Sequence, residues 1–393
     1  MTTKLNILTA VIISLLLGFQ FFVSLKSQQS LPSEEWSRTF ESTIDAGNYA
    51  LMKSIPTETG YATSLLNFDK MDLFTCSEDL QCNQIWSNSE LNPYKNTWSD
   101  GETSYFIKED SLIHSTSSGE KTIAENVENF SKTDDTLMYW LKDHQVVIQR
   151  RDHEPLVYTA EYPIYKGVIA NEQIFIITKT AKNNEYKVIN GNNEFKELFN
   201  FLLKSNENFI SMSFTYDEVT GGRIMLDTEI KSGDTRTKVI RNLPFDLREN
   251  QAPSFTKLEF FDKESGAELF DISSPSLYQG ENGSFITFSA HMYNKYGEKV
   301  NKVFSGNYTD SPIEVSAVTK KGDFFIKPTF VNDQTIAYFK LNGNEKKLMY
   351  SSSTDEKLSE SGTILEGDLK EALYALISLL FVGMLLLLLS FTW

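Results

Sequence analysis

The feature that most constrains the fold is a recurring pair of short strands joined by a tight polar turn. Such pairs fill the chain from about residue 60 to about residue 350, where short aromatic or apolar runs alternate with turn-forming residues. A period of two is typical of a strand that buries one face, and a short polar turn joins two such strands into a hairpin. The expected pairs lie at residues 61–75, 105–114, 138–149, 174–189, 211–226, 257–270, 285–303 and 336–350. The chain is therefore predicted to be all-β between its ends.

The spacing of these pairs centres on about 40 residues, which is typical of propeller blades that bury their faces against neighbouring blades. Over residues 50–360 the pattern resembles β-propeller repeat proteins, and it implies a ring of about seven blades. No blade signature recurs, since Trp98-Ser-Asp-Gly101 is a lone echo of the WD40 motif. A pair of β-sandwiches is the alternative fold.

Both ends of the chain are strongly apolar. The segments Leu5–Val23 and Ala372–Phe391 contain no Asp, Glu, Lys or Arg, and roughly 20 such residues cross a bilayer as a helix. We expect an N-terminal anchor over residues 1–25 and a C-terminal transmembrane helix over residues 372–393. If both cross, both termini are cytoplasmic and the middle lies outside the plasma or inner membrane.

Two alternatives remain for these ends. The first segment is also compatible with a cleaved signal peptide, although the small residues expected at a cleavage site are absent after Phe21–Lys26. The second is compatible with a glycolipid-anchor signal, because Ser361-Gly-Thr363 precedes a polar spacer and the apolar tail. Three glycosylation sequons, at Asn129, Asn282 and Asn307, suit a secretory protein.

The middle of the chain is acidic, with all 53 acidic residues against 36 basic ones, a net charge of −17. A surface of this sign repels phosphate backbones, so nucleic acid is not an expected partner. Residues 26–48 are expected to form a stalk helix, because Trp36, Phe40 and Ile44 recur every four residues. The extracytoplasmic β-domain is then expected over residues 49–365.

The two cysteines, Cys76 and Cys82, are separated by five residues. A close pair without further metal ligands favours a local disulfide in an oxidising compartment, and two free thiols are the alternative. The four histidines show no ligand spacing near this pair. No metal or cofactor is therefore predicted.

No segment carries a linear catalytic motif. The densest charged cluster is Gln149–Glu154, and Glu125 with Glu128 or Asp134 with Asp135 are carboxylate pairs close in sequence. Catalysis would need such groups to converge on one pocket, whereas charged residues at strand ends usually face water. We therefore assign no catalytic residue.

Two segments interrupt the hairpin pattern. Residues 194–204 have the spacing of an inserted helix, with an outer strand as the alternative, and residues 241–253 are expected to be an irregular surface connection.

These observations favour a membrane-anchored, extracytoplasmic binding or scaffolding module, a subunit of an envelope or cell-surface complex. A protein partner or an extracellular ligand is expected. The alternative is an extracytoplasmic enzyme that acts on glycans or peptides at the centre of the propeller, since a site built from several blades leaves no linear motif.

Overall fold

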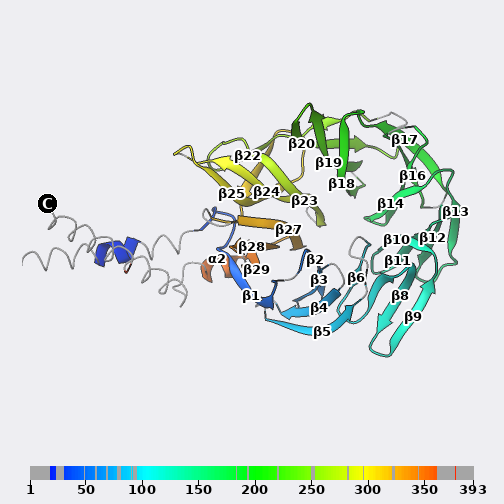
Figure 1. Cartoon of the computed structure of the whole chain (residues 1–393), viewed down its shortest axis with the longest axis horizontal. Helices are drawn as coiled ribbons and strands as arrows, with labels where there is room; N and C mark the ends of the chain where they lie inside the picture. The colour runs from blue at the N-terminus through cyan, green and yellow to red at the C-terminus, as the bar shows by residue number, and fades with distance from the viewer. Residues whose placement is uncertain are drawn as a thin grey trace, which may run out of the picture. The chain divides into compact units, whose positions relative to one another are not determined.

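A computed structural model describes residues 18–23, 31–360 and 377, apart from short stretches between them (48, 58–59, 68–69, 78–80, 90, 92–94, 183, 193, 219–220, 249–252, 281–282, 295, 321–323 and 344). By its contacts the chain divides into two units, Thr39–Ser351 and the flanking segments Met1–Arg38 with Ser352–Trp393. The larger unit contains seven β-sheets. It is a β-propeller of seven blades, as the hairpin pattern predicts (Figure 1).

Six blades are built from four strands and one from five. Their strands, in chain order, are β2(Leu51–Thr57), β3(Gly60–Leu66), β4(Lys70–Ser77) and β5(Cys82–Ser89) in blade 1; β6(Trp98–Ser99), β7(Ser104–Lys108), β8(Ser111–Thr116) and β9(Gly119–Ala124) in blade 2; β10(Val127–Lys132), β11(Thr136–Leu141), β12(Gln145–Arg150) and β13(Leu156–Thr159) in blade 3; β14(Ile164–Ala170), β15(Gln173–Lys179), β16(Glu185–Asn190) and β17(Lys196–Leu202) in blade 4; and β18(Glu207–Asp217), β19(Gly221–Ser232), β20(Thr235–Phe245) and β21(Thr256–Lys257) in blade 5.

Blade 6 departs from the simple meander. Its sheet has the order β22(Phe260–Asp262), β26(Ile313–Ala317), β25(Lys299–Asn307), β24(Gly283–Tyr293) and β23(Phe270–Gly280), and β22 pairs with β26 in parallel. The pair expected over residues 257–270 is present as a short antiparallel hairpin: Phe261 forms a bridge with Glu268, and the Asp262 N–H donates to the Ala267 carbonyl at 2.9 Å. The longer strand pairings lie elsewhere, because β22 joins the sheet through β26 and β23 joins it through β24.

Blade 7 closes the ring with a strand from the other end of the chain. It contains β27(Phe324–Asn332), β28(Thr335–Asn342) and β29(Glu345–Ser352), and β1(Phe40–Asp45) is its fourth strand. The antiparallel register places Phe40 opposite Tyr350 and Glu41 opposite Met349. The domain consequently begins at Thr39 rather than at residue 49.

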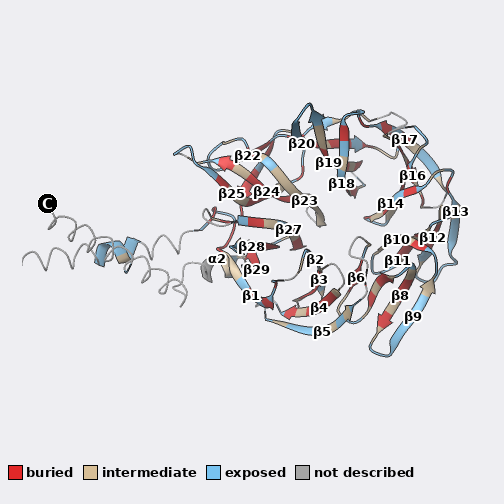
Figure 2. Ribbon diagram, viewed as in Figure 1, coloured by how far each residue is buried: buried red, intermediate tan, exposed pale blue. Residues whose placement is uncertain are grey.

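The core lies between the blades rather than within one sheet. One cluster joins Phe175 and Val188 of blade 4 to Ile224 and Leu243 of blade 5, and another joins Ile44 and Phe339 of blade 7 to residues of blade 1. Figure 2 shows the buried residues concentrated along the strands and the exposed ones at the turns and outer edges. Each blade is therefore stabilised by apolar burial against both of its neighbours.

The strand order defines two faces of the ring. The outermost strand of a blade leads directly to the innermost strand of the next, as where only residues 125–126 connect β9 to β10. First and third strands therefore run one way, and second and fourth strands run the other. β29 is a third strand and β1 a fourth strand, so β29 ends and β1 begins on the same face, which we call the terminus face.

Several local predictions are settled by the strands. The stalk helix expected over residues 26–48 is wrong for the described residues 31–47, which contain β1 and no helix. Residues 194–204 contain β17, the outer-strand alternative. Residues 241–245 are the end of β20, so the irregular connection begins only after Phe245.

The predicted transmembrane segments fall mostly outside the described residues. Residues 18–23 and 377 are helical, and a short helix α2(Asp355–Glu360) follows the last blade. Of the helices that the structure describes, none has the length and apolar character needed to cross a membrane.

Candidate functional site

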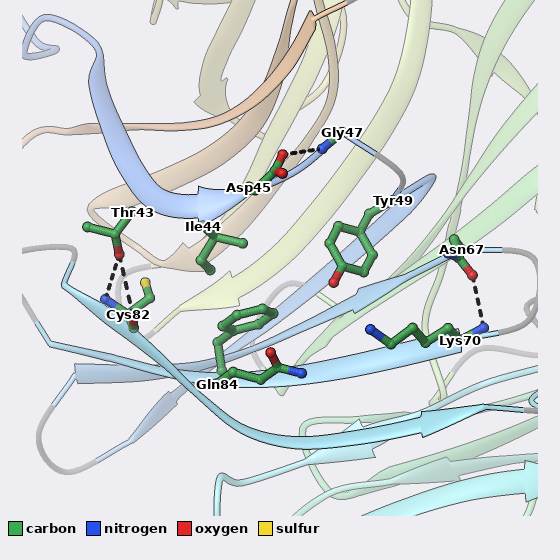
Figure 3. A pocket seen from close by; sticks show the side chains of 10 residues that line it. Thr43, Ile44, Asp45, Gly47, Tyr49, Asn67, Lys70, Cys82 and Gln84 are labelled. Atoms are coloured by element: carbon green, nitrogen blue, oxygen red, sulfur yellow. Dashed lines mark hydrogen bonds between the residues drawn. The ribbon is translucent and has the colours of Figure 1, made fainter.

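A pocket of about 310 Å³ lies where blade 7 meets blade 1. We call it the seam pocket, and Figure 3 shows its lining: Thr43, Ile44, Asp45, Gly47, Tyr49, Asn67, Lys70, Phe74, Cys82 and Gln84. β1 and the segment after it form one wall, and β4, β5 and the turn before β4 supply the other residues. Because β1 is the closing strand, the pocket marks the seam of the ring.

A buried carboxylate fixes the polar side of the seam pocket. The Asp72 side chain is 1% exposed; Lys70 Nζ lies 2.7 Å from it, Gln84 Nε2 donates to it at 3.0 Å, and the Tyr49 hydroxyl donates as well. Burial tends to raise the pKa of Asp72, but hydrogen bonds from Lys70, Tyr49 and Ser87 outweigh it, and the pKa is lowered. Burial, and then the bond to Asp72, raise the pKa of the Tyr49 hydroxyl. These groups hydrogen-bond to one another rather than pointing freely into the pocket. The seam pocket is therefore primarily a structural contact between blades 7 and 1.

The predicted disulfide between Cys76 and Cys82 is present and forms part of this contact. The Cys82 N–H donates to Thr43 Oγ1 at 3.1 Å, and Ser42 Oγ lies 3.7 Å from Cys82 Sγ, so the bridged hairpin holds β1 directly. Cys76 belongs to the same buried cluster as Ile44 and Tyr350. The disulfide therefore supports the closure of the ring as well as the β4–β5 hairpin.

Removing the disulfide is expected to lower the free energy of unfolding. A disulfide across so short a loop stabilises the native state by roughly 2 kcal/mol, because it restricts the unfolded chain. Its loss also weakens the contacts between the β4–β5 hairpin and β1. The Cys76→Ser, Cys82→Ser double variant should show this loss in urea unfolding. Adding a reductant should destabilise the wild type by a similar amount and leave the variant unchanged; equal effects on both proteins would contradict the assignment.

A larger hollow of about 660 Å³ opens on the terminus face across blades 2 and 3. We call it the charged hollow, and it is lined by Tyr105, Ile123, Lys132, Asp134, Asp135, Leu137, Gln149, Arg150, Arg151, Asp152, His153, Glu154 and Pro155. The structure thus brings the predicted cluster Gln149–Glu154 together with the predicted pair Asp134 and Asp135. The turn after β10 and the loop after β12 supply them, because β10, β11 and β12 are consecutive antiparallel strands.

Lys132 is the residue of the charged hollow that sequence reasoning missed. Its Nζ lies 4.4 Å from the centre of the Trp98 ring and 5.6 Å from that of Tyr105, and it donates to the Asp134 carbonyl at 3.0 Å. Tyr105 in turn stacks on His114, with ring centres 4.5 Å apart. Burial lowers the pKa of Lys132. The hollow therefore has an aromatic wall with a cation over it, an arrangement that no local sequence motif signals.

The rim of the charged hollow is open to solvent. Arg151 and Asp135 form an ion pair at 3.1 Å, with both side chains 71% exposed, and Arg150 donates to the Asn192 carbonyl at 3.2 Å. Exposed pairs of this kind contribute little to stability, so their groups are available to a ligand. With acids and bases interleaved and an aromatic wall below, the charged hollow is the candidate recognition site.

The other predicted carboxylate pair does not converge on a pocket. Glu128 forms an ion pair with Lys95 at 2.6 Å, whereas Glu125 lies in the turn between β9 and β10, on the face opposite the terminus face. Among the described residues no group of three or more His, Cys, Asp or Glu side chains is arranged to hold a metal ion.

Asp227 is a buried acid that the sequence pattern does not reveal. It lies on β19, is 3% exposed, and its Oδ1 has no hydrogen-bond partner. Burial raises the pKa of Asp227 to about 6, with Lys238 opposing the shift. The raised pKa means that the native state binds this proton more tightly than the unfolded chain, whose aspartates titrate at about 4.

The Asp227→Asn variant is therefore expected to change the pH dependence of stability. In the wild type Asp227 contributes most to the free energy of unfolding below about pH 4, where it is protonated in both states. As the pH rises from 4 to 6 the free energy of unfolding falls by up to about 3 kcal/mol, because only the unfolded chain releases the proton readily. The variant should match the wild type near pH 4 and exceed it above pH 6.5, as measured by urea unfolding across this range. A difference between the two proteins that does not change with pH would contradict the assignment.

A scan with protein-family models finds no match to the chain, and a search of curated protein sequences finds none. Solved structures that resemble it are β-propellers at low identity. The N-terminal domain of Nup159 is 10% identical, with a TM-score of 0.45 and coverage of 82% of this chain and 97% of that one. The propeller domain of the Trilobed protease from Pyrococcus furiosus is 11% identical, with a TM-score of 0.43 and coverages of 80% and 97%.

The WD40 domain of coronin from Toxoplasma gondii is 12% identical, with a TM-score of 0.42 and coverages of 83% and 88%. Similarities at this level carry no argument about activity. The propeller assignment rests on the seven sheets themselves.

Proposed function

We propose that the chain is a non-enzymatic binding or scaffolding module of an envelope or cell-surface complex, tethered to a membrane by both ends with its propeller outside the cytoplasm. The observation that carries this proposal is the pairing of β1 with β29. These two strands are where the polypeptide enters and leaves the propeller. Because they are antiparallel neighbours, the chain enters and leaves the propeller side by side on one face.

Hydrogen bonds just outside the propeller support this geometry. The Ser37 N–H donates to the Ser352 carbonyl at 2.8 Å, and the Ser352 N–H donates to Ser37 Oγ at 2.9 Å. The two flanking strands of chain are therefore side by side where they begin. Two adjacent starting points suit a pair of helices that enter the same bilayer, and they are unfavourable for tethers to two different surfaces.

The terminus face is the face directed to the membrane in this proposal. Its turns carry exposed acidic residues, among them Glu102, Glu172 and Glu218. Repulsion from anionic headgroups favours a propeller held away from the lipid by its linkers over one that rests on it. The charged hollow then opens towards the space between the membrane and the ring, where the membrane-proximal part of a partner protein would bind.

The disulfide supports the extracytoplasmic location. Such bonds persist in oxidising compartments and are rare in the cytosol, and Cys76 and Cys82 are the only cysteines in the sequence. In a reducing compartment the β4–β5 hairpin that holds β1 would lack its covalent bond.

Two measurements on cells that express the full chain test the proposal. Resistance to carbonate extraction tests integral attachment, and release into the supernatant would contradict it. Alkylation of thiols immediately after acid quenching reads the state of the cysteines in the cell. The proposal predicts that both are blocked until a reductant is added, and two reactive thiols would contradict the external location.

A further inference from the structure

Three lysines occupy equivalent places in the innermost strands of the propeller. Lys53 is the third residue of β2, Lys166 the third residue of β14, and Lys327 the fourth residue of β27. In Figure 1 these strands lie around the middle of the ring, in blades 1, 4 and 7. All innermost strands run in the same direction, so the three residues lie at a similar level along the axis of the ring.

Their surroundings direct these side chains to the axis. An innermost strand has its own blade behind it and a neighbouring blade on either side. A side chain that keeps solvent contact in the middle of such a strand therefore faces the axis. Lys53 and Lys327 are exposed, and Lys166 is partly exposed. Exposed Ile210 of β18, which is 46% exposed, shows that solvent also reaches the innermost strand of blade 5.

These lysines have no anionic partner among the described residues, which is unusual in so acidic a domain. Lysines elsewhere on the propeller do find carboxylates, as Lys95, Lys142, Lys187, Lys257, Lys299 and Lys347 show. Lys53 Nζ instead donates to the Thr97 carbonyl at 2.9 Å, and Lys166 Nζ donates to the Met212 carbonyl. One carbonyl satisfies only one of the three donors of an ammonium group.

The carboxylates of the innermost strands do not compensate for this charge. Of the four carboxylates that the described innermost strands carry, Glu128 pairs with Lys95, Glu207 with Arg241 and Asp271 with Lys299. The fourth, Asp217, is the last residue of β18 and lies at the end of that strand on the terminus face. Burial alone lowers the pKa of Lys53 and of Lys166 to about 8, and no neighbouring carboxylate raises it again. The two ammonium groups therefore lose part of their hydration without gaining a carboxylate partner among the described residues.

We infer that the axis of the propeller binds a small multivalent oxyanion, of the phosphate or polycarboxylate kind, through Lys53, Lys166 and Lys327. Three cations at one level from three separate blades match an anion with several oxygens, because each ammonium can donate to a different one. Bound at the centre, such an anion would also join blades 1, 4 and 7. This site is distinct from the charged hollow, and it does not depend on the membrane proposal.

The test uses the full-length protein in detergent, with inorganic phosphate and citrate as probes at constant ionic strength. Thermal unfolding should show a saturable rise of Tm with at least one of the two anions. Replacing Lys53, Lys166 or Lys327 singly by Gln should weaken the apparent Kd roughly tenfold each. Lys121→Gln on the outer strand β9 removes the same charge at a distance, and it should leave the Kd within about twofold.

Three results would bear on the proposed anion site. A Tm that does not change with either anion, or a shift that chloride reproduces at equal ionic strength, would overturn the site. Equal weakening by Lys121→Gln would show that only net charge matters, which also overturns it. Lys327→Gln keeps the test valid if the other variants fold poorly, because the Lys327 side chain makes no hydrogen bond or ion pair with the described residues and its loss should not disturb folding.

Discussion

Replacing Ile44 by Asp is expected to cost at least about 4 kcal/mol in the free energy of unfolding, because it places a charge in the closing seam. Ile44 is 6% exposed and lies in the cluster that joins blade 7 to blade 1. A carboxylate there would lie among the apolar side chains of this cluster and would displace β1 from β29. Urea unfolding of the full-length protein measures this loss. It should be accompanied by rapid proteolysis next to β1.

The matched control lies on the same strand. Glu41 faces outwards and pairs with Lys347 at 2.9 Å, with half of its side chain exposed. Glu41→Gln should therefore cost less than about 1 kcal/mol. If both variants are equally mild, β1 contributes little to stability and the ring is closed by other contacts. If both are equally severe, the strand tolerates no change and the loss cannot be attributed to the apolar seam.

Replacing Gly222 by Ala is the second substitution with a large expected effect, about 3 kcal/mol. A Cβ at Gly222 would lie 2.1 Å from Cζ of Phe245, whose ring covers the glycine on the neighbouring strand. The ring cannot move freely, because Phe175 and Phe199 pack against it with centres 5.4 Å away in each case. The loss is read from urea unfolding.

A second substitution separates this clash from a general effect of alanine in the strand. Phe245→Leu alone should destabilise by about 1–2 kcal/mol through lost packing. Combined with Gly222→Ala it should cost about 1–2 kcal/mol less than the sum of the two single variants, since the smaller side chain leaves room for the methyl group. Simple additivity would show that the ring is not the obstacle.

The sequence predicts most of the architecture because the hairpins are local. Seven of the eight expected strand pairs are neighbours in the structure, for example β15 with β16 and β28 with β29. Their alternation is visible since one side of each strand packs on a neighbouring blade. In blade 6 the expected pair is reduced to a short hairpin around the bridge between Phe261 and Glu268, and β22 joins its sheet through β26, about 50 residues further along the chain. A parallel pairing between strands so far apart in the chain has no connecting turn, so no local sequence pattern predicts it.

The closing strand β1 is not predictable for a different reason. Its two inward positions are Ser42 and Ile44. Ser42 is polar, so the alternation of a strand is hidden and the spacing of Trp36, Phe40 and Ile44 imitates a helix. Ser42 is tolerated in the interior because its hydroxyl accepts from the Ile44 N–H at 3.1 Å and lies beside Cys82 Sγ. Its partner strand begins about 300 residues later, beyond the reach of any local pattern.

The candidate sites also divide into those made of residues close in sequence and those formed only when separate blades pack together. The cysteine pair and the cluster Gln149–Glu154 are local in sequence and can be identified from it, and the cluster faces solvent, as its position at a strand end predicts. The position of Lys132 over Trp98 depends on the packing of blade 2 against blade 3. The axial lysines become a group only when the innermost strand of each blade is known.

Protease treatment of intact cells or spheroplasts tests the proposed topology, with the propeller outside and both ends in the membrane. With distinguishable tags at the two termini, we expect release of a soluble fragment of roughly residues 31–360, with Cys76 and Cys82 disulfide-linked and both tags protected in the membrane. Protection of the whole chain until the membrane is opened would place the propeller inside and contradict this topology.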